Sequence, residues 1–159
     1  NANLWPAAEY ARRLAAARQL AGIMALVLEE DQYDHEAWLA TVRGLEHEPE
    51  RGVRCRRCFE FSLRRTAVVA DRLGFPAFTT TLTLSPHKET AVIFAIGRQF
   101  PKYQPWDFKQ EDGFLRSVGL SRKYGLYRQN YCGCEFSLAA REQRVRNAAS
   151  GAMPVEVDA

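Results

Sequence analysis

The four cysteines of this chain fall into two close pairs that are far apart in the sequence. Cys55 and Cys58 stand in RCRRCFEF, Cys132 and Cys134 stand in YRQNYCGCEFS, and no cysteine occurs between the pairs. If the fold brings the pairs together, four thiols could hold a tetrahedral zinc ion or an iron–sulfur cluster. The folded positions of these two segments therefore decide which sites the chain can build.

Cys55 and Cys58 are expected to lie at the start of a helix, three residues apart and therefore on one face. The helix dipole and the neighbouring arginines are expected to lower the pKa of both thiols and so to favour the thiolate that binds metal. Structural zinc sites, iron–sulfur clusters and thioredoxin-type redox pairs all use the Cys-x-x-Cys spacing. Two core cysteines on an apolar helix face would give the same pattern, so the spacing leaves these alternatives open.

Cys132 and Cys134 are separated only by Gly133. A disulfide between them would close a very small ring, and only glycine lets the backbone bend enough. Such a disulfide is strained and easily reduced, as a redox-active pair requires. As thiolates, the two residues could instead bind a metal.

Length and composition indicate one ordinary globular domain. The chain has 159 residues, of which 47% are apolar and 26% are charged. No stretch approaches the length of a membrane span, and no signal segment opens the chain. Four cysteines then point to metal or redox chemistry in the cytoplasm. We expect a single domain over residues 1–150 and a flexible tail over 151–159.

Helix and strand patterns alternate along the chain. The runs 23–30 and 77–84 have the apolar and β-branched character of strands. Caps, prolines and glycines predict helices between and after these runs, over 7–22, 35–43, 55–73, 86–98 and 111–125, and again after Cys134. Strands that alternate with helices predict an α/β fold with a parallel sheet and helices on its faces.

The net charge is only +3, but the 22 basic residues are mostly arginine. Arginine suits phosphate because its planar fork donates two parallel hydrogen bonds. Five arginines crowd the first cysteine pair, at positions Arg54, Arg56, Arg57, Arg64 and Arg65. Such a cluster would attract a polyanion towards the cysteines, although an arginine-rich surface could also be only solvated.

Four segments in order resemble the QueH family of epoxyqueuosine reductases: RCRRCFEFSLRRTAVVADRLGF, FTTTLTLSPHK, DFKQEDGFLRS and YGLYRQNYCGCEFS. The opening NANLWPAAEYARR and the loop GLEHEPERGVRC are similar to that family as well. The resemblance covers roughly residues 1–138. Four linked motifs are far more specific than one Cys-x-x-Cys.

The resemblance implies both a fold and a reaction. The family is a Rossmann-like, three-layer α/β domain with a mostly parallel sheet. It acts on transfer RNA with a GUN anticodon and removes the epoxide oxygen of epoxyqueuosine at the wobble position, which leaves queuosine. This two-electron reduction requires an electron donor, which the sequence does not identify, and the family performs it without cobalamin.

The resemblance also implies roles for the cysteines. Cys55 and Cys58 match the Cys-x-x-Cys that binds a [4Fe-4S] cluster, and Cys132 and Cys134 match a redox-active pair. In the family, a first strand ends in adjacent cysteines that complete the cluster, whereas this sequence begins just after that position. We expect a preceding segment with those cysteines, or an inactive chain, or a CGC motif that serves as a ligand pair.

Further candidates lie in the segments that carry the resemblance. Asp107 could bind a second iron ion or donate a proton to the opening epoxide, or could cap the next turn. The remaining candidates could contact transfer RNA through phosphate or base stacking, although each also has an ordinary capping, packing or solvated role: Arg56, Arg57, Ser85, His87, Lys88, Lys109, Tyr127, Arg128, Gln129, Tyr131, Arg141, Arg144 and Arg146.

Two other classes of function also fit the cysteines. One is a nucleic-acid-binding module with a structural zinc ion and no catalysis. The other is a thiol–disulfide oxidoreductase, although thioredoxin-like chains need no CGC motif. Iron and sulfide in the purified protein would favour the reductase, and zinc would favour the module.

Overall fold

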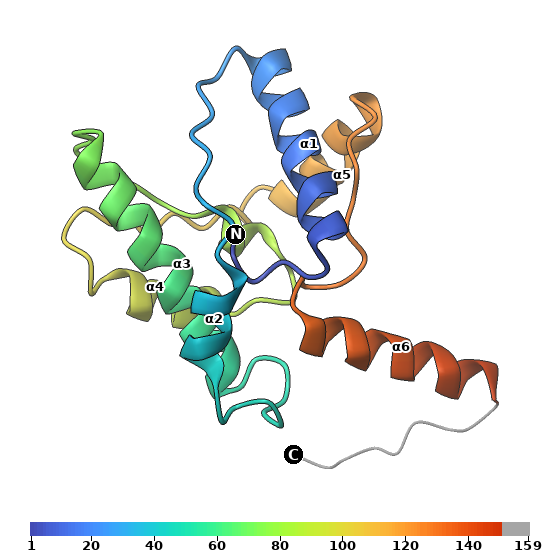
Figure 1. Ribbon diagram of the computed structural model, residues 1–159. Coiled ribbons are helices and arrows are strands. Elements are labelled where there is room, and N and C mark those ends of the chain that lie inside the picture. The colour runs from blue at the N-terminus through green and yellow to red at the C-terminus, as the bar shows by residue number, and fades with distance from the viewer. Residues whose placement is uncertain (151–159) are drawn as a thin grey trace.

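The computed structural model describes residues 1–150, which fold into helices joined by irregular segments (Figure 1). The elements are α1 (Ala7–Met24), α2 (His35–Val42), α3 (Val53–Arg72), the 3₁₀ helix η1 (Thr81–Leu84), α4 (Thr90–Gly97), α5 (Gly113–Lys123) and α6 (Glu135–Ala149). The tail predicted over 151–159 lies outside the described residues. The single-domain boundary stays a prediction.

The predicted α/β fold is wrong for the part of the chain that the structure describes. Residues 1–150 contain no strand, and the one β-type pairing there is an isolated parallel bridge between Phe78 and Tyr103. There is accordingly no parallel sheet and no Rossmann-like three-layer arrangement in this region. The two predicted strands failed for different reasons.

The run 23–30 forms no strand because nothing pairs with it. Helix α1 continues through Met24 and ends at Ala25, which takes the left-handed conformation with φ 52°. The chain beyond is extended and exposed, and Val27 is 98% exposed. A strand buries its backbone polar groups only against a neighbouring strand. The prediction of a buried strand over this run is therefore wrong, because its first two residues belong to α1 and the rest is exposed.

The run 77–84 begins as a strand and then coils. Phe78 pairs through two backbone hydrogen bonds, from its own N–H to Lys102 (3.0 Å) and from the N–H of Gln104 to its carbonyl (2.8 Å). The hydroxyl of Thr80 then accepts from the N–H of Leu82 (3.2 Å) and starts η1. Threonine hydroxyls that bond locally to the backbone compete with sheet pairing, and here they prevail over β propensity.

Most of the predicted helices are confirmed, with shifted ends. Helix α2 begins where Asp34 was expected to cap it, since the carboxylate accepts from the N–H of Ala37 at 3.0 Å. The helix expected from Pro86 begins only at Thr90, because Ser85 to Lys88 form a turn instead. In that turn the hydroxyl of Ser85 accepts from the N–H of His87 (3.3 Å), so Ser85 caps a turn rather than a helix.

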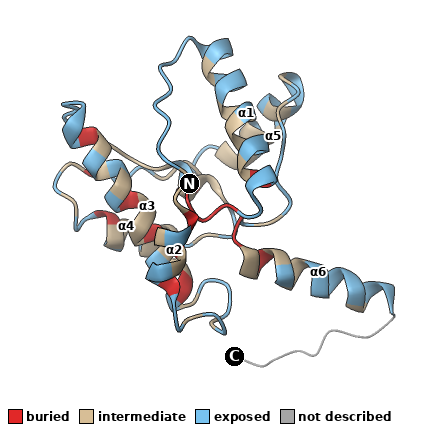
Figure 2. Cartoon of the chain, viewed as in Figure 1, coloured by how far each residue is buried: buried red, intermediate tan, exposed pale blue. Residues whose placement is uncertain are grey.

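Helix α3 is the centre of the packing, with α2 and α4 against it and η1 against α4. Its apolar face buries Leu63, which is 1% exposed, and the neighbouring helices bury Trp38 (1%) and Ile93 (0%). Buried segments gather where these helices meet (Figure 2). This packing holds the start of α3, and with it Cys55 and Cys58, in a fixed place.

Helix α6 projects away from the other helices (Figure 1), and most of its length is exposed (Figure 2). Its one buried residue is Ser137, in the first turn. The start of α6 is therefore the part that the fold holds in place, and the CGC motif immediately precedes it. None of the helices in residues 1–150 is long and apolar enough to cross a membrane.

Candidate functional site

The structure brings the two cysteine pairs to one place, where two helices begin. Cys55 and Cys58 occupy the first turns of α3, and Cys134 is the N-cap residue of α6. Cys134 is buried in a core cluster with Trp38, and Cys58 packs against that cluster. All four cysteines are free thiols, and Cys132 is exposed. Cys132 is thus the exposed member of a group whose other cysteines are partly or fully buried.

Burial changes the chemistry of the first pair. It raises the pKa of Cys58 to about 12, against the lowering effect of the facing Trp38 indole, and the nearby Cys132 and Cys134 raise it further. Burial likewise raises the pKa of Cys55, although the N–H of Arg51 donates to its sulfur at 3.3 Å. The expected lowering of these pKa values is therefore wrong, because desolvation outweighs the helix dipole and the arginines.

The described residues do not form a complete metal site. In residues 1–150 no group of three His, Cys, Asp or Glu side chains is arranged to hold a metal ion. A [4Fe-4S] cluster and a structural zinc ion both need four ligands, of which Cys55 and Cys58 offer two. Although Cys132 and Cys134 lie nearby, they do not complete a ligand set in this arrangement.

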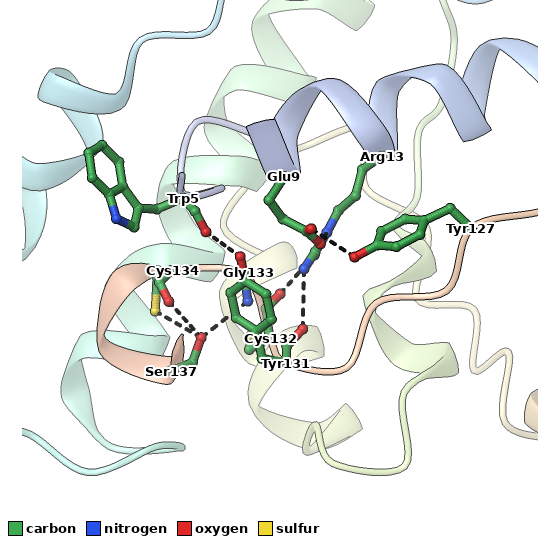
Figure 3. Close-up of polar contacts among 9 residues, drawn as sticks. All are labelled: Trp5, Glu9, Arg13, Tyr127, Tyr131, Cys132, Gly133, Cys134 and Ser137. Atoms are coloured by element: carbon green, nitrogen blue, oxygen red, sulfur yellow. Dashed lines mark hydrogen bonds and ion pairs between the residues drawn. The ribbon is translucent and has the colours of Figure 1, made fainter. Parts of the chain in front are cut away.

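The CGC loop has an unusual backbone shape that hydrogen bonds fix. Gly133 has φ 140°, a conformation that residues with a side chain rarely adopt. Its N–H donates to the hydroxyl of Ser137 (3.1 Å), and its carbonyl accepts from the N–H of Trp5 (2.7 Å). The thiol of Cys134 lies 3.5 Å from the same Ser137 hydroxyl (Figure 3). The loop thus holds one thiol inside and leaves Cys132 outside.

Asp107 lies in a second group, at the start of α4. Its carboxylate accepts from the N–H of Lys109 (3.1 Å), which is the turn-capping role that the sequence also allowed. The ammonium of Lys109 donates to the carbonyl of Lys88 (2.5 Å) and to the hydroxyl of Thr90 (3.1 Å). Among residues 1–150, no hydrogen bond or ion pair joins this group to the cysteines, and the contact of Asp107 with an epoxide stays a prediction.

The aromatic and polar residues before the CGC motif are partly committed to contacts within the chain. The hydroxyl of Tyr127 donates to Glu9 (2.7 Å), and the hydroxyl of Tyr131 donates to the carbonyl of Trp5. Arg128 donates to the hydroxyl of Ser121 (3.2 Å). These contacts favour a packing role for the hydroxyl groups, and base stacking by the rings stays a prediction.

The five arginines around the first cysteine pair do not form one free cluster. Arg54 is 5% exposed and donates to three carbonyls of the preceding loop, while its guanidinium lies 4.6 Å from the ring of Phe136. Arg57 and Arg64 both pair with Glu60 (3.3 and 2.7 Å). The others are Arg65, which pairs with Asp31, and Arg56, which is exposed and makes no ion pair within residues 1–150.

A partly buried polar pair beside Cys134, His35 with Glu135, was missed by the sequence analysis. His35 is 8% exposed and lies 3.2 Å from Glu135 through its Nε2 atom, and the imidazole is stacked on Trp5 and Trp38. The second carboxylate oxygen of Glu135 is buried without a partner. The sequence signal that could have identified Glu135 is its position directly after the CGC motif.

The sequence analysis also missed an ion pair, Glu9 with Arg13, that reaches the CGC loop from α1. In the sequence these residues stand four apart on a predicted helix, a spacing that usually marks a solvated pair. The partner residues lie more than a hundred positions away in the chain. No local pattern could reveal that contact.

Comparisons with known proteins show the family of the chain. A family model described as epoxyqueuosine reductase QueH matches residues 1–140. Two relatives of that name are similar to the chain: one from Streptococcus pyogenes is 41% identical and aligns with 86% of the chain, and one from Thermotoga maritima is 35% identical and aligns with 91%. The matched region spans 58% of the Streptococcus protein and 79% of the Thermotoga protein.

The matched region contains both cysteine pairs, the loop that carries Asp107, and the start of α6. Two of the segments that suggested the relationship carry the cysteine pairs that the fold brings together. On the extent of the match and the identity to these relatives, the chain belongs to the QueH family of epoxyqueuosine reductases.

Proposed function

We propose that this chain is the thiol-bearing part of a cytoplasmic oxidoreductase that converts epoxyqueuosine to queuosine in transfer RNA. The relatives are named epoxyqueuosine reductases, and that name motivates the substrate. The single observation that carries the proposal is the gathering of both cysteine pairs, with Cys132 exposed and Cys134 buried beside it.

The proposed reaction balances with two thiols as the reductant. Cys132 and Cys134 each give up a hydrogen, their sulfurs join as a disulfide, and the epoxide oxygen leaves as water while the alkene forms. Cys132 meets the substrate because it is the exposed member, and Cys134 closes the disulfide from inside the loop. An external electron donor then returns two electrons and two protons to the disulfide. No cobalamin enters this scheme.

Cys55 and Cys58 are proposed as ligands of a [4Fe-4S] cluster, and Asp107 as a proton donor or a ligand of a second iron ion. The described residues supply two of the four cluster ligands, so the assignment depends on ligands beyond them. The support is the Cys-x-x-Cys spacing on the first turns of α3. Metal analysis of the anaerobically purified protein tests it.

The activity is tested by serine substitution. Protein purified without oxygen is incubated with transfer RNA that carries epoxyqueuosine, and the nucleosides are separated by mass. The Cys132→Ser and Cys134→Ser variants should form no queuosine while their iron and sulfide content stays that of the wild type. Queuosine formation by either variant would contradict the thiol mechanism, and loss of iron in Cys134→Ser would make the CGC motif a ligand pair instead.

The proposed partner is a transfer RNA with a GUN anticodon, bound through phosphates. A surface pocket between α2 and α3 is lined by Arg43, Arg57 and Arg64, close to the start of α3. Binding should weaken steeply with salt, because each neutralised phosphate releases counterions. Replacing Arg56 and Arg57 by alanine should lower the affinity and flatten the salt slope. Arg18→Ala on α1 is the control, and an equal slope in the double variant and the control would contradict this interface.

A further inference from the structure

The backbone of the CGC loop is attached to helix α1 through one guanidinium. Arg13 donates from Nη1 to the carbonyl of Cys132 (3.0 Å) and from Nη2 to the carbonyl of Tyr131 (3.2 Å). Its Nε donates to Glu9 on the same helix at 2.8 Å (Figure 3). One side chain thus fixes two consecutive peptide groups next to the exposed thiol.

Glu9 holds the guanidinium of Arg13 through the ion pair on the side away from the loop. It is 4% exposed, and both of its carboxylate oxygens have partners, since Oε2 accepts from the hydroxyl of Tyr127 at 2.7 Å. Burial alone would raise the pKa of Glu9, but the hydrogen bonds from Arg13 and Tyr127 hold it below its ordinary value. A buried ion pair that is fully hydrogen-bonded holds its geometry firmly, because breaking it leaves an unpaired buried charge.

The next peptide groups of the loop are fixed by other residues. The carbonyl of Gly133 accepts from Trp5, and its N–H donates to Ser137. The carbonyls of residues 131 to 133 are therefore all hydrogen-bonded while the loop carries free thiols. In this form Cys132 is exposed and Cys134 is buried, so the fixed backbone belongs to the dithiol state.

We propose that Glu9 and Arg13 are positioning residues that hold the CGC loop in its dithiol form and thereby raise the reduction potential of the Cys132–Cys134 pair. This inference rests on the proposed redox role of that pair. The couple is two thiols against one disulfide, two protons and two electrons. Hydrogen bonds that exist in the dithiol form and weaken when the small ring closes make the disulfide easier to reduce. The external donor then regenerates the thiols more readily.

The test measures this couple directly, without RNA. Full-length protein is equilibrated in buffers with set ratios of glutathione and its disulfide, and the free thiols are alkylated. Tryptic cleavage after Arg128 and Arg141 releases both cysteines in one peptide, whose mass reports the disulfide. In Arg13→Gln the equilibrium should shift towards the disulfide by about tenfold, which corresponds to about 30 mV for two electrons.

Three further variants separate positioning from general structure. Arg18→Gln removes a guanidinium of the same helix that pairs with Glu30 far from the loop, and it should leave the equilibrium unchanged. Arg13→Lys keeps the charge, so its equilibrium should lie between that of the wild type and that of Arg13→Gln. Tyr127→Phe removes only the hydroxyl that donates to Glu9. It should shift the equilibrium towards the disulfide by less than Arg13→Gln does. It serves as the test if Arg13→Gln fails to fold.

The outcomes distinguish the two levels of the proposal. If Arg13→Gln and Tyr127→Phe have the wild-type equilibrium, the positioning role is overturned while the redox pair stands. A shift towards the dithiol in these variants overturns it as well. If the wild-type pair forms no disulfide at any glutathione ratio, the redox role under the proposed function fails, and the inference fails with it.

Discussion

Replacing Gly133 by alanine should destabilise the fold strongly, because the site has neither the backbone freedom nor the space for a side chain. Gly133 has φ 140°, and an added Cβ would lie 2.6 Å from Leu4 Cδ2 and 3.0 Å from Arg13 Nη1. The first distance is shorter than ordinary van der Waals contact. The second brings a methyl group against the guanidinium that holds the loop.

The two effects have separate magnitudes. A residue with a side chain held in so sparsely populated a backbone region costs about 1–3 kcal/mol. Overpacking by one carbon costs about 1–3 kcal/mol, and the flexible end of Leu4 places this site at the lower end of that range. The sum is about 2–4 kcal/mol, which lowers the ratio of folded to unfolded chain by about 30- to 1,000-fold.

The assay is urea unfolding followed by circular dichroism, with Gly119→Ala as the matched control. Gly119 lies in the exposed face of α5, and an added Cβ there meets no atom within 4 Å. Alanine at Gly119 should stabilise the fold by about 0.5–1 kcal/mol, because glycine is unfavourable inside a helix. If both variants unfold at the same urea concentration, the shape of the CGC loop described above is refuted.

Three further predictions concern buried polar groups. Arg54→Ala should lower the free energy of unfolding by about 3 kcal/mol, because it leaves three loop carbonyls without their charged donor. In the same urea assay, the control Arg56→Ala should change the free energy of unfolding by less than about 0.5 kcal/mol, because Arg56 is exposed. Thr83→Val should cost about 1–3 kcal/mol by urea unfolding, since the fully buried hydroxyl donates to Trp106 and valine has no donor. The pKa of Glu9 lies below its ordinary value of 4.5, so the ionised carboxylate stabilises the fold above about pH 4.5. The difference in the free energy of unfolding between the wild type and Glu9→Gln should therefore shrink as the pH falls below that value. A difference that stays constant with pH would contradict the ionised pair.

The helices were predictable because their signals are local. The cap at Asp34, the glycine after α2 at Gly44 and the apolar face of α3 all depend on residues a few positions apart. A side-chain cap and a left-handed glycine need no information about the rest of the chain. These elements therefore appear where the sequence placed them, within a few residues.

The strands were not predictable in the same way, because a strand depends on its neighbours. The run 23–30 has the composition of a buried strand, yet Val27 is almost fully exposed. The threonines of 77–84 have high β propensity, yet Thr80 and Thr83 use their hydroxyls to bond local and distant backbone groups. Propensity describes what suits a sheet, and it does not supply the sheet.

The sequence allowed the two cysteine pairs to lie together, but it did not predict the contacts that hold them. The cysteines were identified by spacing, and the fold gathers them as the sequence allowed. The residues that hold them, Arg13 on α1 and Ser137 on α6, carry no signal of their own in the sequence. Arg13 reaches the loop through two hydrogen bonds that form only when α1 and the segment around residue 132 meet in the folded chain, whereas Ser137 bonds Gly133 four residues before it.

Exposure distinguishes Cys132 from the other three cysteines. Both pairs lie at or next to the start of a helix. Burial nevertheless raises the pKa of Cys58 to about 12, so that this thiol keeps its proton and resists exchange in the absence of metal. Cys132 is exposed on a loop that Arg13 fixes, where a large substrate can reach it. Cys132 is the exposed member of the four cysteines, whereas Cys55 and Cys58 are partly buried and Cys134 is buried. This difference in exposure supports the assignment of Cys132 as the thiol that meets the substrate.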